Sequence, residues 1–475
     1  MPTRTTAQTE QPAAPVAPSP LPQSHNSPVA DRLALGKALR ERCSRKAQAE
    51  WKPPAKRADP IELLIENSRG RIEDLIPIRY GRMLANPFAF YRGAAAIMAY
   101  DLSQTPSTGL TLQACGDCHL VNFGGFATAE RRINFDINDF DETAIAPWEW
   151  DVKRLAASFV VAGRANGFSA GDCREAAHRA AQNYRTKLAE YSQQSVLEVW
   201  YDAIDFDYLI RHAPDKQART FYLKKLDANA KQSAHEKEFA KLAFAAGETP
   251  RIVDHPPLIY HTNDLRDVEQ RATAEAALAD YRNSLPMERR VLIDRYTLTD
   301  VAFKVVGVGS VGTRCGIALL MSGKGDPLFL QFKQARQSVL EPYAGASPFK
   351  HSGQRVVVGQ RLMQSASDMF LGWYTGHEAN HFYVRQLSDA KIKPVIEIMK
   401  PQNLLSYAGL CGWALARAHA RSGDAAVLTG YLGTSSAFED AIADFSEAYA
   451  DQNERDHAAL VAAVRAGKVE ARVVE

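Results

Sequence analysis

The stretch ACGDCHLVNFGGFATAERRINFDINDFDE, residues 114–142, places polar side chains at the ends of two short apolar segments. Each segment contains β-branched or aromatic residues, which predicts a strand followed by a polar loop. The first loop carries Asp117, His119 and Asn122, and the second carries Asp139. We expect the rest of the chain to be built around these two loops.

Asp117 and Asn122 are five positions apart, and Asp139 follows later in the chain. Phosphoryl-transfer enzymes of the protein-kinase type use these residue types in this order: a base aspartate, an asparagine that binds metal and an aspartate that binds metal. The transferred group is anionic, so divalent cations must neutralise it, and hard cations prefer oxygen ligands. Asp and Asn also cap ordinary turns, which is the alternative interpretation of the first loop.

The second loop is an acidic turn in which Asp139 and Asp141 follow closely after Asp136. Like charges at this spacing repel one another unless a cation lies among them. We expect Asp139 to be the first metal ligand and Asp141 the second, with Asp136 as a less favoured third candidate. In the neighbouring loop, His119 is a candidate catalytic residue, although a histidine that only orients the loop fits the same pattern.

A second informative stretch, residues 295–335, is rich in β-branched residues and glycine, which predicts three strands joined by hairpins. Residues 307–312, GVGSVG, fit the G-x-G-x-x-G pattern of dinucleotide-binding folds. Such folds begin a helix after the third glycine, whereas the apolar TRCGIALLM follows here. We therefore expect a hairpin whose backbone N–H groups approach a phosphate. The candidate nucleotide-binding residues of this loop are Gly307, Gly309, Ser310 and Gly312.

Lys333 lies in the next apolar strand, LFLQFKQA, where a kinase places the lysine that pairs with phosphates. We favour this role over that of a solvated surface lysine. Glu341 is its candidate ion-pair partner, although an exposed glutamate at a helix end fits the spacing equally well. Arg92, inside the apolar run FAFYRGAAA, would be costly to bury unpaired, so we expect it to contact an acidic loop or a phosphate.

The composition of the 475-residue chain is that of a soluble globular protein, with 46% hydrophobic residues, 24% charged residues and a net charge of +2. This balance gives no global basic field for nucleic acid. No apolar run approaches the ~20 residues that span a bilayer, and the N-terminus lacks the apolar region of a secretory signal. Six scattered cysteines indicate a reducing compartment, so we expect a cytoplasmic protein.

The chain divides by composition into four segments. Residues 1–30, rich in Pro, Ala, Ser and Thr, are expected to be a disordered tail. Residues 31–294 are mainly helical in pattern and hold the two polar loops. Residues 295–400 are strand-rich, and residues 401–475 return to amphipathic helix.

Local patterns add three expectations about single elements. A helix should begin near Trp148, with Asp151 and Arg154 as its polar anchors. A break is expected at Asn86-Pro87, because proline pushes its predecessor out of the helical region. The segments QRVVVGQRLMQ and HFYVRQLSD, within residues 354–389, are interpreted as further strands.

The first loop also matches C-x-x-C-H, the attachment pattern of c-type haem, through Cys115, Cys118 and His119. Haem attachment requires export, and we expect no signal peptide here. One haem site would also leave the glycine loop and the acidic turn unexplained. We interpret the match as a coincidence, which an absorbance scan for a Soret band tests.

Over residues 60–460 the chain resembles a bacterial family catalogued as a domain of unknown function (DUF2252). That family is similar to the protein-kinase-like superfamily, particularly aminoglycoside and choline phosphotransferases, which carry a GDxHxxN catalytic loop. The segments that carry the resemblance are NPFAFYRGAA, CGDCHLVNFGGF, FDINDFDET, PWEWDVKRLAAS, VGVGSVGTRC, LQFKQA and ARAHARSGD.

The resemblance implies an ATP- and Mg²⁺-dependent enzyme. Gly116, Asp117, His119 and Asn122 match the GDxHxxN loop, which implies Asp117 as the catalytic base. It also implies that Asn122 and Asp139 hold magnesium. Lys333 would contact the ATP phosphates beneath the glycine loop.

The order of these motifs departs from that of ordinary kinases. In kinases the glycine loop and lysine precede the catalytic loop, whereas here they follow it, and ARAHARSGD, residues 416–424, resembles the helix that leads into a catalytic loop. We therefore expect an α+β, two-lobed, protein-kinase-like fold that is circularly permuted. Its small β-rich lobe, residues 295–400, would be inserted between two parts of a large helical lobe.

The leading hypothesis is a phosphotransferase that acts on a small-molecule acceptor bearing a hydroxyl or an amine. Two alternatives stay open: a nucleotide-binding pseudoenzyme that senses or scaffolds, and a nucleotidyl transferase that uses the same site. Neither the acceptor nor the oligomeric state follows from the sequence.

Overall fold

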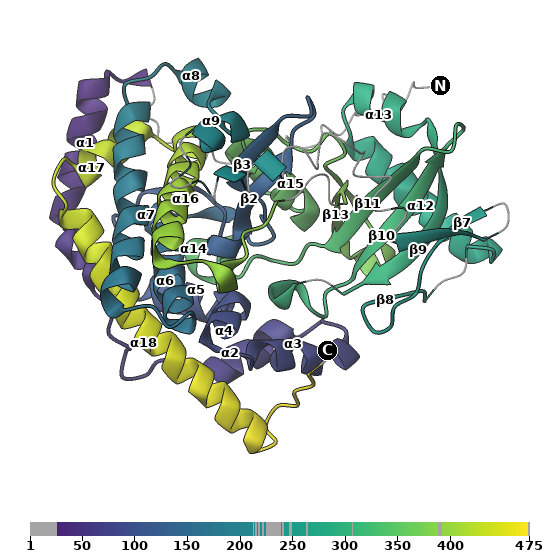
Figure 1. Cartoon of the computed structure of the whole chain (residues 1–475), viewed down its shortest axis with the longest axis horizontal. Coiled ribbons are helices and arrows are strands. Elements are labelled where there is room, and N and C mark those ends of the chain that lie inside the picture. The colour runs from purple at the N-terminus through teal and green to yellow at the C-terminus, as the bar shows by residue number, and fades with distance from the viewer. Residues whose placement is uncertain are drawn as a thin grey trace, which may run out of the picture.

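The computed structural model describes residues 26–473, except 212, 214–215, 217–218, 221–222, 225–238, 240–241, 247–248, 263–264, 306 and 388–391. The described residues form a mixed α+β fold, with a helical part and a sheet-rich part side by side (Figure 1). Most of the predicted tail, residues 1–30, lies outside the described residues, and the first helix begins at Val29. Helices long and apolar enough to cross a membrane do not occur in the part of the chain that the structure describes.

The helical part is built around α6 (Trp148–Ala165), whose first sixteen residues are all buried. Its sequence carries apolar side chains all round the helix, which suits a helix with neighbours on several faces. The predicted helix start near Trp148 is confirmed. Helices α7, α16 and α18 pack around α6. The other bounds in this part are α1 (Val29–Arg42), α7 (Ala170–Tyr191), α8 (Val196–Tyr201), α9 (Phe206–Arg211), α16 (Pro401–Ser422), α17 (Ala425–Leu432) and α18 (Ala437–Arg465).

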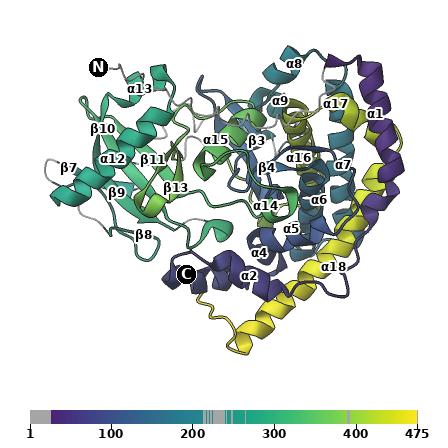
Figure 2. The ribbon, with the colours of Figure 1, turned by 180° about the vertical axis from the view of Figure 1, so that it is seen from behind.

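The short helices α2 to α4 lie along the lower edge of the molecule, where α2 and α4 contact α18, and α5 lies above them beside α6 (Figure 2). The Asn86 side chain accepts a hydrogen bond from the Ala89 N–H at 2.8 Å and so caps the third of these helices. The predicted break at Asn86-Pro87 is therefore confirmed. The bounds are α2 (Pro60–Ser68), α3 (Ile76–Met83), α4 (Pro87–Gly93) and α5 (Ala95–Ser103).

Two small antiparallel sheets carry the two polar loops of residues 114–142. In the first sheet β1 pairs with β4, and in the second the order is β2-β3-β5. The first loop joins β1 to β2, and the acidic turn joins β3 to β4. The strands are β1 (Thr111–Ala114), β2 (Phe123–Ala127), β3 (Ile133–Ile137), β4 (Ala144–Pro147) and β5 (Ile204–Asp205).

The sheet-rich part is a six-stranded antiparallel sheet in the order β12-β13-β11-β10-β9-β8. The glycine loop joins β9 to β10, and Gly323–Pro327 turns β10 into β11, so the predicted three-stranded meander is confirmed. Cys315 lies opposite Lys333 in the register of β10 and β11. The strands are β8 (Ile259–Tyr260), β9 (Tyr296–Lys304), β10 (Cys315–Ser322), β11 (Pro327–Gln334), β12 (Gly372–Thr375) and β13 (His381–Gln386).

One predicted strand is wrong: QRVVVGQRLMQ forms most of α15 (Ser352–Met363). Its buried face includes Val356 and Val357, and Gly353 packs so closely on β13 that a Cβ there would lie 2.3 Å from the Phe382 carbonyl oxygen. Tertiary packing has thus overridden the β-propensity of the valines. The other segment, HFYVRQLSD, is confirmed as a strand over its first six residues, β13 (His381–Gln386), while its last two lie outside the described residues.

The sheet-rich part begins earlier than residue 295, because β8 belongs to its sheet and α12 packs on β12. A separate hairpin, β6 with β7, also precedes that residue. The remaining elements of this part are β6 (Ala243–Ala246), β7 (Thr249–Ile252), α12 (Val268–Ser284) and α13 (Met287–Ile293). Helix α14 (Glu341–Ala344) contacts α5 and β4 and so lies with the helical part.

Candidate functional site

A cavity of about 640 Å³ lies between the two polar loops, the six-stranded sheet and the short helices of the lower edge. Ten of the twelve predicted site residues line it, although they come from segments that are far apart in the sequence. Gly312 and Glu341 are the two that do not. The ten are Arg92, Asp117, His119, Asn122, Asp139, Asp141, Gly307, Gly309, Ser310 and Lys333.

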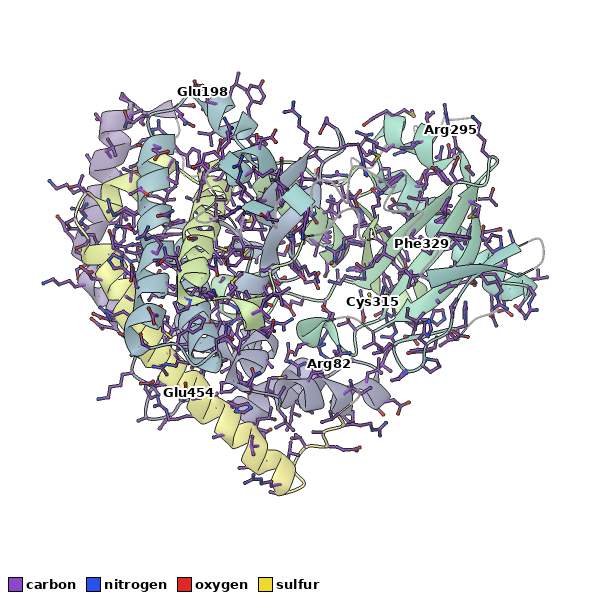
Figure 3. The ribbon with its side chains drawn as sticks, in the orientation of Figure 1. Arg82, Glu198, Arg295, Cys315, Phe329 and Glu454 are labelled. Atoms are coloured by element: carbon purple, nitrogen blue, oxygen red, sulfur yellow. The ribbon has the colours of Figure 1, made fainter. Side chains whose placement is uncertain are left out.

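Figure 3 shows how the sheet meets the helical part. Cys315 marks the end of β10 that faces the helices, and Arg295 marks the opposite end of the sheet. Because Cys315 pairs with Lys333 in register, Lys333 also lies at the end that faces the helices. The register of β10 and β11 therefore places Lys333 at the cavity.

Asp117 is held by a buried arginine from α6. Arg154 Nε donates to Asp117 Oδ1 at 2.7 Å, and its Nη2 contacts the same oxygen. The other oxygen, Oδ2, lies 3.8 Å from His119 Nε2. Asn122 Nδ2 donates to the Asp117 carbonyl oxygen at 2.7 Å, so the two predicted site residues fix each other within one loop.

A second anchor from α6 fixes the backbone of this loop. Asp151 accepts hydrogen bonds from the N–H groups of Cys115 at 2.7 Å and Gly116 at 3.0 Å. His419 of α16 contacts Asp151 Oδ2 through Nε2 at 3.2 Å, and Tyr184 contacts the other ring nitrogen of His419 at 2.8 Å. Both polar anchors expected in α6 therefore act on the first loop.

Gly116 is required by this geometry. Its φ is +88°, and a Cβ at this position would lie 2.2 Å from the Glu142 carbonyl oxygen. Only glycine adopts such a backbone at little cost, and no larger residue would fit against the acidic turn. The glycine thus lets the first loop and the acidic turn touch each other.

His119 is buried and uncharged at neutral pH. Burial lowers its pKa to about 3, against the raising effect of the nearby Asp117 carboxylate. Its Nδ1 atom is buried without a hydrogen-bond partner among the described residues. A neutral, buried ring agrees with the orienting role that the sequence left open.

The acidic turn is tied to the sheet through Lys333. Lys333 Nζ donates to Asp141 Oδ2 at 2.7 Å and lies 3.9 Å from Asp139 Oδ2. Tyr383 donates through its hydroxyl to Asp141 Oδ1, and Ser310 Oγ donates to Asp141 Oδ2 at 3.1 Å. Asp141 is thus engaged by three donors, whereas the Asp139 side chain is 32% exposed.

The two carboxyl groups of this turn have different proton affinities. Burial and the repulsion of Asp141 raise the pKa of Asp139 above its usual range. Burial also opposes ionisation of Asp141, but Lys333 and the Tyr383 hydroxyl outweigh it and hold its pKa below the usual range. Burial would lower the pKa of Lys333, yet the two carboxylates hold it well above its ordinary value. Lys333 and Asp141 are therefore a charged pair at neutral pH.

Two predicted carboxylates have other partners. Glu341 does not pair with Lys333: it lies 3.6 Å from Arg355 Nε and accepts the Ser338 N–H at 3.1 Å and the Ser347 N–H at 3.3 Å. Asp136 turns away from the acidic turn and forms a fully buried ion pair with Arg417 of α16 at 2.6 Å. Its charge is neutralised without a metal ion.

The glycine loop is held by the segment between α2 and α3. Arg71 Nη1 donates to the carbonyl oxygens of Gly309 at 3.0 Å and Val311 at 2.6 Å. The Ile72 N–H donates to the Gly312 carbonyl oxygen at 2.7 Å. Gly312 has φ of +84° and packs against Arg71, which explains why it supports the loop without lining the cavity.

The cavity is rich in lysine and arginine side chains, and most of them are not among the residues predicted for the site. Nine lysine and arginine side chains and four carboxylates line it among the described residues, an excess of positive charge. A sequence signal existed for Arg79, which stands in an apolar helix turn beside an aromatic residue. The cations not predicted for the site are Arg71, Arg79, Arg131, Lys304, Arg336, Arg385 and Lys393.

The two cysteines of the first loop lie on the core side of the loop. Ligand atoms of Cys115, Cys118 and Asp151 lie within 4.8 Å of one another. Burial raises the pKa of both thiols, that of Cys118 to about 11, and the Asp151 oxygens already accept two N–H groups. We assign these buried residues a structural role, and covalent attachment of a haem would require the thiols to leave the core.

Comparison with known proteins identifies one family. The model of a family described as "Uncharacterized protein conserved in bacteria (DUF2252)" matches residues 71–463. No curated protein and no solved structure matches the chain. The matched range contains every residue that lines the cavity except Asn67.

Proposed function

The chain belongs to the bacterial DUF2252 family, whose description states no reaction, and we propose that it is an ATP- and magnesium-dependent phosphotransferase acting on a small molecule. The proposal includes a protein-kinase-like, circularly permuted fold. In this fold the sheet-rich part serves as the nucleotide lobe, and the helical part carries the base and the metal ligands.

One observation carries the proposal. Lys333 and the glycine loop, which come late in the chain, share one cavity with Asp117, Asn122 and Asp139. The Lys333 ammonium lies 3.9 Å from Asp139 and 2.7 Å from Asp141. A lysine, a glycine hairpin, an amide and two carboxylates around one cationic cavity are the parts that phosphoryl transfer requires.

The charges of the cavity suit a nucleotide triphosphate. A polyanion would compensate the excess of positive charge among the lining residues. Lys333 would contact the phosphates, as the phosphate-pairing lysine of a kinase does. The loop residues Gly307 and Gly309 expose backbone without side chains, so phosphate oxygens can approach their N–H groups.

Asn122 and Asp139 have the donor chemistry for magnesium. Asn122 uses its Nδ2 to bond the Asp117 carbonyl oxygen, which leaves the amide oxygen for a cation. Asp139 is partly exposed in the cavity, whereas three donors engage Asp141. We therefore assign Asn122 and Asp139 as the main ligands, and a bound cation would neutralise phosphate charge there.

The remaining chemistry belongs to the first loop. The acceptor oxygen or nitrogen forms a bond to the γ-phosphorus, and the bond from that phosphorus to the bridging oxygen breaks, so ADP leaves with the electron pair. The acceptor proton passes to Asp117, whose Oδ1 is held by Arg154 while Oδ2 is the oxygen that can receive it. Arg154 and Asp151 thereby orient the base and its loop.

The test is incubation of the purified chain with γ-labelled ATP, magnesium and a bacterial metabolite extract. A labelled small molecule together with ADP supports phosphoryl transfer, and the Asp117→Asn variant should give neither. ATP binding without product would favour a pseudoenzyme, and release of pyrophosphate would favour nucleotidyl transfer. Absence of any ATP binding to the native chain would contradict all three readings of the cavity.

A further inference from the structure

The lower end of the cavity carries a group of arginines, which we call the arginine cluster: Arg71, Arg79, Arg92 and Arg336. Three come from α2 to α4 and the segments between them, and one follows β11. Arg79 is 1% exposed and Arg71 is 9% exposed, so the cluster reaches into the protein interior. In Figure 3 the labelled Arg82 marks α3, the helix that also carries Arg79.

The hydrogen bonds of the cluster go to uncharged oxygens. Arg79 donates to Ser68 Oγ at 2.9 Å and to the Gly93 carbonyl oxygen at 2.9 Å. Arg336 donates to the carbonyl oxygens of Asn67 at 2.9 Å and of Arg69 at 2.6 Å. Arg71 donates to the glycine-loop carbonyls already described. These bonds position the guanidinium groups without neutralising them.

No member of the cluster forms an ion pair with a carboxylate in the described part of the chain. The Nε atoms of Arg79 and Arg92 are buried without a hydrogen-bond partner there. Burial lowers the pKa of Arg79 to about 10, and burial also lowers the pKa of Arg71, Arg92 and Arg336. The protein itself therefore stabilises these charges poorly.

The carboxylates of the cavity are engaged elsewhere. Asp117 is bonded to Arg154, and Asp141 is bonded to Lys333. Glu142 interacts electrostatically with Arg71, Arg79 and Arg336 without forming an ion pair with them; it accepts the Val339 N–H at 2.8 Å, and burial raises its pKa. At one end of the cavity the acidic turn is thus paired directly with Lys333, whereas at the other end the arginine cluster has no carboxylate in ion-pair contact among the described residues.

Buried cations without a paired counter-ion are costly, and an anionic ligand would supply the missing counter-ion. Guanidinium groups suit phosphates and carboxylates because their donors match the oxygens of both. Building on the phosphotransferase proposal, we propose that the arginine cluster binds an anionic group of the acceptor, so that the acceptor is a small molecule carrying a phosphate or a carboxylate.

The position of Arg92 favours the acceptor over the nucleotide as the source of this anion. Arg92 interacts electrostatically with Asp117, the proposed base. The acceptor must lie next to the base that takes its proton. An anion held by Arg92 therefore belongs to the molecule beside Asp117, whereas the nucleotide phosphates are assigned to Lys333.

The test is calorimetric titration of the whole chain with inorganic phosphate, before and after saturation with a non-hydrolysable ATP analogue and magnesium. We expect phosphate to bind in both conditions with affinities within about threefold. Competition by the ATP analogue would assign the cluster to the nucleotide and overturn the proposal. Absence of phosphate binding in both conditions would overturn it as well.

Variants separate the two ends of the cavity. Arg92→Gln and Arg336→Gln should each weaken phosphate binding about tenfold or more, because each removes charge-assisted hydrogen bonds, while ATP affinity changes less than threefold. The matched control is Arg69→Gln, which removes the same charge from a side chain that is 75% exposed. It should leave both affinities unchanged. If the control lost as much phosphate affinity, the effect would come from the overall positive charge of the protein. That result would contradict a binding site at the arginine cluster.

Failure of this inference differs from failure of the proposed function. If the native chain does not bind ATP, the phosphotransferase proposal fails, and the acceptor assignment fails with it. If ATP binds and its binding requires Lys333, but Arg92→Gln and Arg336→Gln keep the native affinity for phosphate, only the acceptor assignment fails.

Discussion

Asp117 presents its two carboxylate oxygens to different surroundings. Arg154 takes Oδ1, and Oδ2 lies near the neutral ring of His119 at the cavity surface. A carboxylate fixed in this way can receive a proton from one direction only. At the residue scale, the distinctive property of Asp117 is therefore the fixed orientation of its carboxylate.

Asp117→Asn should abolish phosphoryl transfer while leaving ATP affinity within about twofold. The amide keeps the size of the side chain and a contact with Arg154, but it cannot accept the proton, so turnover should fall at least about 100-fold. Product formation and calorimetric ATP binding measure the two effects. Turnover at the native rate would remove Asp117 from the mechanism.

His119 should make stability depend on pH. Its folded pKa of about 3 lies below the ordinary value, so folding favours the neutral ring. The resulting stabilisation of the folded state is fully present above about pH 6.5 and decreases as the pH falls toward the folded pKa. The total loss of stability is on the order of 4 kcal/mol. Denaturant unfolding of the native chain and His119→Asn between pH 7 and 4 should show a steeper fall for the native chain.

The control for this comparison is His377→Asn, at a side chain that is 84% exposed. It should follow the native curve at every pH. Parallel curves for the native chain and His119→Asn would contradict the buried neutral ring.

Ten of the twelve residues that the sequence predicted for the site line the cavity, but most of the lining cations and the partners of the predicted residues were not predicted. Lys333 was predicted from its apolar strand and the preceding glycines. Its partner, Asp141, lies 192 positions away, whereas the predicted Glu341 was only near in sequence. Pairing of charges depends on which loops the fold brings together, and a local pattern does not contain this information.

At the scale of elements, the glycine loop is fastened on two sides. Ser310 bonds to Asp141 across the cavity, and Arg71, in the segment after α2, bonds to loop carbonyls. Gly312 has φ of +84°, and a Cβ there would lie 3.1 Å from Arg71 Cβ, whereas Gly307 has φ of −56° and open space around it. The two glycines therefore have different functions in the same loop.

Gly312→Ala should lower the free energy of unfolding by about 1–3 kcal/mol, because alanine is strained at positive φ and crowds Arg71. Gly307→Ala is the matched control and should change stability by less than about 0.5 kcal/mol. Thermal or denaturant unfolding measures both. Equal stabilities would show that Arg71 does not hold the loop in the described conformation.

Element prediction succeeded where local pattern and tertiary context agree. The meander of β9, β10 and β11 follows from alternating apolar strands with glycine turns between them. Helix α15 was predicted as a strand because its valines are common in strands, yet Gly353 lets the helix pack directly on β13. Close packing of a helix on a sheet is a property of two elements, so neither sequence alone reveals it.

At the scale of the whole molecule, the first loop region and the C-terminal helices form one unit. Asp136 of β3 is paired with Arg417 of α16, and both side chains are fully buried. Arg417 also donates to the Met363 carbonyl oxygen at 3.0 Å, which adds α15 to the contact. Three segments far apart in the chain are thus joined at one charged centre.

Arg417→Met should destabilise the protein by about 3–5 kcal/mol, because it leaves the Asp136 carboxylate buried without a partner. Arg465→Met, at an exposed position near the end of α18, is the control and should be nearly neutral. Denaturant unfolding gives both values. If Arg417→Met costs less than about 1 kcal/mol, the pair does not join the two regions.

The pair between Asp136 and Arg417 also bears on synthesis of the chain, since its partners are 281 residues apart. At ordinary elongation rates of about 5–20 residues per second, the ribosome takes roughly 15 to 60 seconds to supply the arginine after the aspartate has emerged. During that interval the nascent β2-β3 hairpin holds an unneutralised acid that the mature core must bury. Maturation of the segment that carries the two polar loops therefore waits for α16, and chaperones that shelter unfinished chains have this interval in which to act.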